Sequence, residues 1–68
     1  MTGSEDETTT YELVWHKMRI ATHEAWNVNR ARVHFRKFVD DSNELIRGDC
    51  EFHDINDDPD GDIKRYYL

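Results

Sequence analysis

A single cysteine, Cys50, stands in a chain of 68 residues, so no intrachain disulfide can hold the fold together. A chain this short buries only about 60% of the surface that its unfolded form exposes, and ordering it costs roughly 1.5 kcal/mol per residue. The fold therefore depends on a small hydrophobic core, and a structural metal or a partner subunit is the remaining means of support. A lone cysteine is also typical of a reducing compartment.

Neither a membrane span nor a secretion signal is expected from the sequence. The longest apolar run is Leu13-Val14-Trp15, whereas a span needs about 20 residues. The first residues, Met-Thr-Gly-Ser-Glu-Asp-Glu, are acidic where a signal peptide is basic and then apolar. We expect a cytoplasmic protein with a disordered acidic tail over residues 1–9 and a single small domain over residues 10–68.

Charge is segregated along the chain. The formal net charge of −6 divides into −4 over residues 1–16, +5 over residues 17–38, −9 over residues 39–62 and +2 over residues 63–68. A basic segment therefore lies between two acidic ones. Such a pattern favours contact with other macromolecules through electrostatic complementarity.

Two hydrophobic periodicities compete beyond the tail. A heptad-like series from Tyr11 to Ile46 is apolar at nine of its eleven positions, which favours helix. Strands are favoured by the many Thr, Val, Ile, His and aromatic residues, and by the scarcity of Ala and Leu, with three of each. We prefer strands because the turns described next agree with one another.

Three turns divide the chain into four strands. Asp58-Pro59-Asp60-Gly61 has proline and glycine where a tight turn needs them. Two further turns are expected at residues 40–43 and 21–25. The resulting registers place Phe52 opposite Leu68 and Leu13 opposite Val33.

The predicted fold class is all-β: a four-stranded antiparallel meander, curled as a small barrel or paired into a dimer. The alternative is an α+β fold with one short helix near residues 22–31, capped by Thr22. A helical hairpin is the third possibility. Each solution must cover one apolar face of the sheet or helix pair.

The first predicted hairpin carries an apolar patch that the core does not use. Its members are Met18, Ile20, Trp26 and Val28, whose parity is opposite to that of the predicted core face. The patch is either the curled end of a barrel core or an exposed arm that binds a partner.

Three groups of side chains are candidate small-ligand sites. His16, Arg30 and His53 share a row across the predicted sheet and are suited to binding an anion. Glu12, His34 and Asp49 share another row and form a candidate metal or acid–base centre, although a charge-paired outer face is the simpler interpretation of both rows. The third group lies in the acidic turn, where Asn56, Asp58 and Asp60 match part of a calcium-loop pattern that lacks its final glutamate. Zinc is not expected, because Cys50 and His53 point to opposite faces of one strand.

The expected function is that of a non-catalytic protein-interaction module, an adaptor or inhibitor that forms homo-oligomers. No cofactor and no enzymatic activity are expected, because the chain has no glycine-rich phosphate loop and no nucleophile elbow. Asp57, Asp58 and Asp60 would face a protein partner with a basic surface, and the apolar patch would anchor it. The alternative is a single-strand nucleic-acid-binding β domain that uses Arg30, Arg32 and Arg36, which the flanking acidic segments disfavour.

Overall fold

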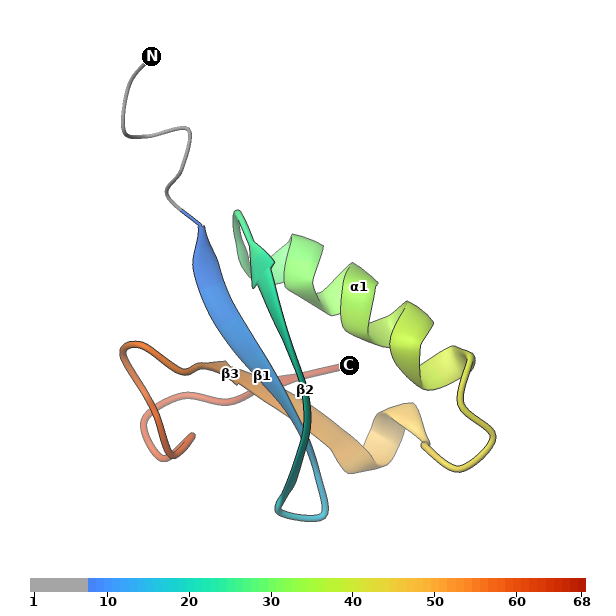
Figure 1. Ribbon diagram of the computed structural model, residues 1–68. Helices are drawn as coiled ribbons and strands as arrows, with labels where there is room; N and C mark the ends of the chain where they lie inside the picture. Colours follow the sequence, from blue (N-terminus) through green and yellow to red (C-terminus); the bar gives the residue numbers. More distant parts are fainter. Residues whose placement is uncertain (1–7) are drawn as a thin grey trace.

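The computed structural model describes residues 8–68, which form an open four-stranded antiparallel sheet with one helix packed on it (Figure 1). The strand order across the sheet is β2-β1-β3-β4, so β1 is central and β2 is an edge strand. The elements are β1 (Thr9–Trp15), β2 (Met18–Ala25), α1 (Val28–Asp40), the 3₁₀ turn η2 (Arg47–Asp49), β3 (Cys50–Asp54) and β4 (Tyr66–Tyr67).

The β1–β2 hairpin closes through a two-residue turn at His16 and Lys17. Both residues have positive φ, 49° and 66°, which is the backbone of the turns that match the right-handed twist of a hairpin. The pairing runs from Thr9 opposite Ala25 to Trp15 opposite Met18. The sequence lacks the Asn-Gly signature of such a turn, and this explains why the turn was predicted at residues 21–25 instead.

Strand β1 also pairs with β3, and this second pairing sets the two faces of the sheet. Leu13 lies opposite Phe52 and Trp15 opposite Cys50. These side chains share one face, here called the front face, because side chains alternate along a strand. Glu12 and His53 lie opposite each other on the back face.

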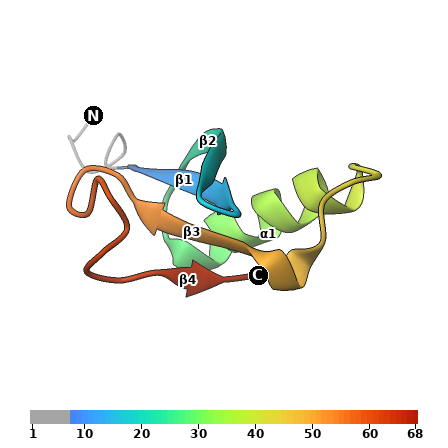
Figure 2. The ribbon, with the colours of Figure 1, turned by 90° about the horizontal axis from the view of Figure 1, so that it is seen from below.

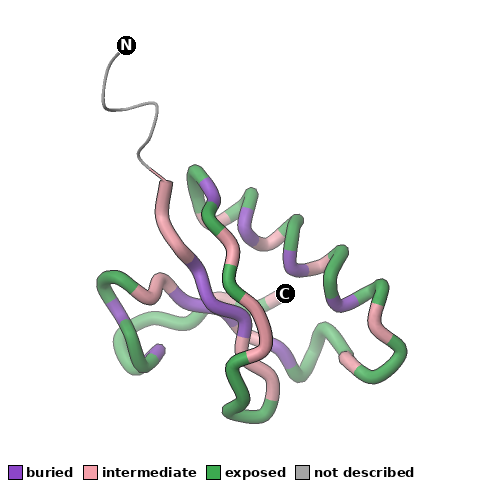
Figure 3. Tube along the Cα trace, viewed as in Figure 1, coloured by how far each residue is buried: buried purple, intermediate pink, exposed green. Residues whose placement is uncertain are grey.

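Helix α1 covers the front face, as Figures 1 and 2 show. Asn27 caps its start, with the side-chain Oδ1 accepting the Arg30 N–H at 3.0 Å. The buried residues of α1 are Ala31, Phe35 and Val39, which are four apart and therefore lie on one side of the helix. Figure 3 shows this buried side turned toward the sheet.

The core forms where α1 meets β1 and β3. The ring of Phe35 lies 5.5 Å from the ring of Phe52, centroid to centroid, and both side chains are fully buried. Burial of a side chain of this size contributes roughly 1.5–3 kcal/mol. The complete core comprises Tyr11, Leu13, Ala25, Ala31, Phe35, Val39, Cys50 and Phe52.

The predicted all-β meander, whether curled into a barrel or paired into a dimer, is wrong as a fold class. Residues 28–40 form a helix instead of the predicted strand, and the sheet is open. The reason is that the four-residue spacing of buried positions and the Asn27 cap together outweigh the strand preference of single residues. The alternative α+β fold also misplaced its helix near residues 22–31. Residues 22–25 belong to β2, and the helix is capped by Asn27 instead of Thr22.

Two predictions at the C-terminal turn have different outcomes. The turn itself is confirmed, since the Gly61 N–H donates to the Asp58 carbonyl at 3.0 Å. The register is shifted by two residues, with Phe52 opposite Tyr66 instead of Leu68. A shift of two keeps every side chain on its predicted face.

The predicted acidic tail falls almost entirely on residues 1–7, which lie outside the described residues, and Thr9 belongs to β1. Within residues 8–68, no helix has the length and apolar character needed to cross a membrane.

Candidate functional site

A groove of about 650 Å³ lies between α1 and the end of β2 and is here called the β2–α1 groove. Its large apolar members, Trp26 and Val33, are 51% and 56% exposed and lie together in one concave surface. Positions 30, 33, 34 and 37 fall on one side of a helix, opposite the buried stripe. The groove is lined by His23, Glu24, Ala25, Trp26, Asn29, Arg30, Val33, His34 and Lys37.

The rings of His23 and His34 stack inside the groove. Their centroids lie 3.5 Å apart and their planes differ by 4°. Burial lowers the pKa of His34, and the neighbouring His23 and Lys37 lower it further. Arg30 and Lys37 supply the fixed positive charges of the groove.

Glu24 also lines the groove and offsets one of these positive charges, while its Oε1 accepts the hydroxyl of Thr8 at 3.2 Å. An apolar floor flanked by a guanidinium and an ammonium group is suited to a ligand that is both apolar and anionic. The groove thus has the chemistry of a binding surface for an acidic segment.

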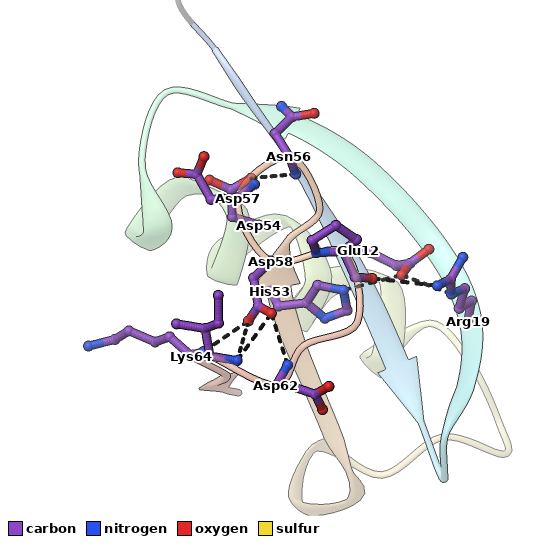
Figure 4. Close-up of polar contacts among 11 residues, drawn as sticks. Glu12, Arg19, His53, Asp54, Asn56, Asp57, Asp58, Asp62 and Lys64 are labelled. Atoms are coloured by element: carbon purple, nitrogen blue, oxygen red, sulfur yellow. Dashed lines mark hydrogen bonds and ion pairs between the residues drawn. The ribbon is translucent and has the colours of Figure 1, made fainter.

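A second surface lies on the back face, where the segment between β3 and β4 folds over the sheet. We call residues 57–63 the acidic loop. The buried carboxylate of Asp58 holds this loop by accepting backbone N–H groups from Asp62 at 2.9 Å, from Ile63 at 3.1 Å to each oxygen, and from Lys64 at 2.8 Å (Figure 4). Burial by itself raises the pKa of Asp58. The hydrogen bonds from these N–H groups and the nearby His53 lower it by a larger amount, so the net pKa shift is downward.

A buried polar pair supports the loop from below. His53 Nε2 lies 3.3 Å from Glu12 Oε1, and Arg19 Nε lies 3.3 Å from the same oxygen (Figure 4). His53 and Glu12 are almost fully buried, and neither atom of their contact reaches hydrogen-bond geometry. Gly61 rests on the His53 ring, with φ of +71° and space for no side chain. The loop is therefore fixed at both its turn and its carboxylate.

The acidic loop turns its remaining side chains outward. Ile63 is 80% exposed, the highest exposure among the large hydrophobic residues of the described chain. Asp57, Asp60 and Asp62 are exposed in the same loop. The loop thus presents an apolar side chain among carboxylates, held in one conformation by Asp58.

The predicted anion site is not assembled. His16 lies in the β1–β2 turn, 3.8 Å from Asp49. Arg30 lines the groove, and His53 is buried on the back face. These three residues therefore belong to three separate surfaces.

The candidate metal residues are likewise dispersed. Glu12 lies under the acidic loop, His34 lines the groove and Asp49 accompanies His16. Within residues 8–68, no three His, Cys, Asp or Glu side chains converge on a possible ion position.

The predicted calcium-loop residues take part in hydrogen bonds with backbone N–H groups instead. Both oxygens of Asp58 accept N–H groups, and the Asn56 N–H donates to Asp54 at 2.8 Å. Asp60 is exposed and separate from them. The acidic turn is therefore built as a self-capped loop, in which Asp58 has no free oxygen for a cation.

The predicted apolar patch is divided. Ile20 and Val28 pack against the core. Met18 is 54% exposed beside the hairpin turn, whereas Trp26 lies beyond the far end of the eight-residue strand β2. Only Trp26 contributes to the groove.

The predicted nucleic-acid residues are separated by the helix. Arg32 Nε donates to the Tyr67 carbonyl at 3.0 Å and Arg36 Nη2 to the Leu68 carbonyl at 2.9 Å, on the flank of α1 away from Arg30.

The sequence-based interpretation missed Val33 and Lys37 of the groove and Ile63 of the loop. Helical spacing from Arg30 would have revealed the first two.

Comparison with protein-family models, curated proteins and solved structures finds no match to this chain. The two surfaces described above therefore carry the functional proposal.

Proposed function

We propose that the chain is a non-catalytic protein-interaction module that binds an acidic segment of a partner protein in the β2–α1 groove. The observation that carries this proposal is the exposed pair Trp26 and Val33 beside the fixed charges of Arg30 and Lys37. Tryptophan and arginine are the residue types that most often dominate the energy of protein interfaces.

The groove supports binding because it is formed before any partner arrives. Asn27 caps α1 next to Trp26, and the His23–His34 stack joins the helix to β2. A preformed surface avoids about 0.5–1.5 kcal/mol of ordering cost for each side chain that is already immobilised. A short acidic segment with one apolar side chain can therefore bind with useful affinity.

The acidic loop supplies a second surface of opposite charge. Asp57, Asp60, Asp62 and Ile63 are all exposed in this loop, while the groove opens beside α1. This loop is suited to a partner with a basic surface, as expected from the composition of residues 39–62. A module with two complementary surfaces has the properties of an adaptor.

The direct test uses the fluorescence of Trp26. In a Trp15→Phe variant, Trp26 is the one remaining tryptophan, and a blocked pentapeptide of four glutamates around a central leucine serves as the probe. We expect a saturable change in Trp26 emission, and an approximately tenfold weaker affinity when Arg30→Gln and Lys37→Gln are combined. Lys64→Gln, which removes a positive charge outside the groove, is the matched control and should bind normally.

Two outcomes of this titration would contradict the proposal. The first is an affinity equal to that of a peptide with lysine in place of glutamate. The second is saturation by oligothymidine, abolished by the same groove substitutions, with no response to the acidic peptide. That result would make the groove a single-strand nucleic-acid site.

A further inference from the structure

We infer that the acidic segment bound by the β2–α1 groove is the acidic loop of a second copy of this chain, so that copies associate head to tail. This inference rests on the proposed function of the groove. The loop offers exposed Ile63 between Asp62 and Lys64, with Asp60 exposed in the same loop, and the groove offers Trp26 and Val33 beside Arg30 and Lys37, with Glu24 also in its lining. Both halves of a complementary contact are therefore present on one chain.

The conformation of the loop favours this contact. Asp58 holds the backbone N–H groups of Asp62, Ile63 and Lys64, so the Ile63 side chain projects outward without a further ordering step. The turn is set by the left-handed conformation of Gly61 against His53. Association therefore brings together two surfaces that are each already formed.

The position of the loop excludes its docking in the groove of its own copy. Gly61 of the loop lies against the ring of His53 on the back face, and Arg19 Nη2 reaches the Pro59 carbonyl at 3.5 Å. Helix α1 lies on the front face (Figures 1 and 2). The loop would have to leave His53 and Arg19 to reach the groove, so the contact forms between copies.

The contact is heterologous, because each copy uses its loop on one neighbour and its groove on the other. Such contacts build open chains unless the rotation between copies closes a ring. A loop seated in a groove is smaller than the roughly 1,200–2,000 Å² of a standard stable interface. The expected association is therefore weak, with dimers and longer species appearing between micromolar and millimolar protein.

The competing arrangement is a symmetric dimer through the open edge of β2. Arg19 and Glu24 on this strand are exposed charged residues, and charged edge residues oppose edge-to-edge pairing. An edge dimer needs neither Ile63 nor the groove charges. Variants of the loop and of the groove therefore distinguish the head-to-tail contact from the edge dimer.

The experiment is a complementation measured by sedimentation equilibrium. The loop variant combines Asp60→Asn, Asp62→Asn and Ile63→Ser, and the groove variant combines Arg30→Gln and Lys37→Gln. Wild type should increase in weight-average mass with concentration from the monomer mass of 8.2 kDa. Each variant alone should remain monomeric, and an equimolar mixture should form a dimer and nothing larger, since only one intact loop and one intact groove then meet.

Two results would overturn the inference: a mixture that stays monomeric while wild type associates, or a loop variant that associates as wild type does. The second result would place the interface outside the acidic loop, as in an edge dimer. Wild type that stays monomeric to millimolar concentration, while still binding the acidic pentapeptide, would remove this inference and leave the proposed function intact. Variants are preferred to added salt, because each copy has a net charge of −6 and salt also relieves their general repulsion.

Discussion

The carboxylate of Asp58 accepts the backbone N–H of Lys64 at 2.8 Å, a bond that spans six residues and closes the acidic loop on itself. The same carboxylate accepts the N–H groups of Asp62 and Ile63. A single buried side chain thus replaces the backbone pairing that this segment lacks between β3 and β4.

Asp58→Asn should lower the melting temperature clearly, because the amide offers one acceptor oxygen where the carboxylate offers two. Asp60→Asn is the matched control, since Asp60 is exposed in the same loop, and it should melt close to wild type. Thermal unfolding followed by circular dichroism measures both. Equal melting temperatures for the two variants would show that the Asp58 bonds do not stabilise the fold.

Acid should remove this stabilisation. The folded-state pKa of Asp58 lies below its ordinary value near 3.9, so the unfolded chain takes up the proton first as the pH falls. The contribution of Asp58 is therefore complete above about pH 4 and is lost as the pH falls through the folded-state pKa. Urea unfolding from pH 6 to pH 3 should show a flatter profile for Asp58→Asn than for wild type, and parallel profiles would contradict this assignment.

Gly61→Ala should destabilise the protein by about 1 kcal/mol or more, because φ of +71° is costly for any residue with a side chain. The added methyl would also lie 3.0 Å from His53 Nδ1. Gly48→Ala is the control, since nothing lies within 4 Å of its added methyl, and it should stay within about 0.5 kcal/mol of wild type. The free energy of unfolding in urea decides between them, and equal losses would refute the role of Gly61.

Replacing His16-Lys17 by Asn-Gly should stabilise the protein by roughly 1 kcal/mol. Both residues adopt left-handed φ values, which cost an ordinary residue about 1–2 kcal/mol and suit Asn and Gly. The exposed contact of His16 with Asp49, at 3.8 Å, would be lost at little cost. Lys17→Ala is the control without glycine and should bring no gain; a double variant less stable than wild type would contradict the assigned turn.

The histidine stack in the groove should make stability weakly dependent on pH. The pKa of His34 is lowered by burial, by His23 and by Lys37. The unfolded chain therefore binds the proton first, and stability falls as the pH drops below about 6.5. Because His34 is largely exposed, the effect is small. His34→Gln should remove it and His16→Gln should keep it in urea unfolding from pH 8 to pH 5.

Part of the fold was predictable from the sequence. Asn27 followed by buried positions at Ala31, Phe35 and Val39 is a helix signature, but the β-branched and aromatic content of the same segment concealed it. The Asp58–Gly61 turn was predictable because its residues have the required φ values. The His16–Lys17 turn was not, because neither residue type favours positive φ.

The candidate site was likewise predictable only in part. Trp26, Asp57 and Asp60 were predicted from the sequence to lie on the surface, and all three are exposed. Assigning residues 28–39 to a strand placed Arg30 beside Arg32 and Arg36, whereas the helix turns Arg30 toward β2 and the other two toward β4. The capping role of Asp58 depends on a chain reversal within the loop, which no local pattern predicts.

The contact between Ile63 of one copy and Trp26 of another is the central claim, and isotope-filtered NMR tests it most directly. In a millimolar mixture of ¹³C-labelled and unlabelled chains, we expect intermolecular nuclear Overhauser effects between the Ile63 methyl groups and the Trp26 indole. These signals should vanish when both the labelled and the unlabelled chain carry the groove variant, which keeps Ile63 and Trp26 but lacks the groove charges of Arg30 and Lys37. Intermolecular signals that connect β2 to β2, or an associated sample with no signal between Ile63 and Trp26, would contradict the account.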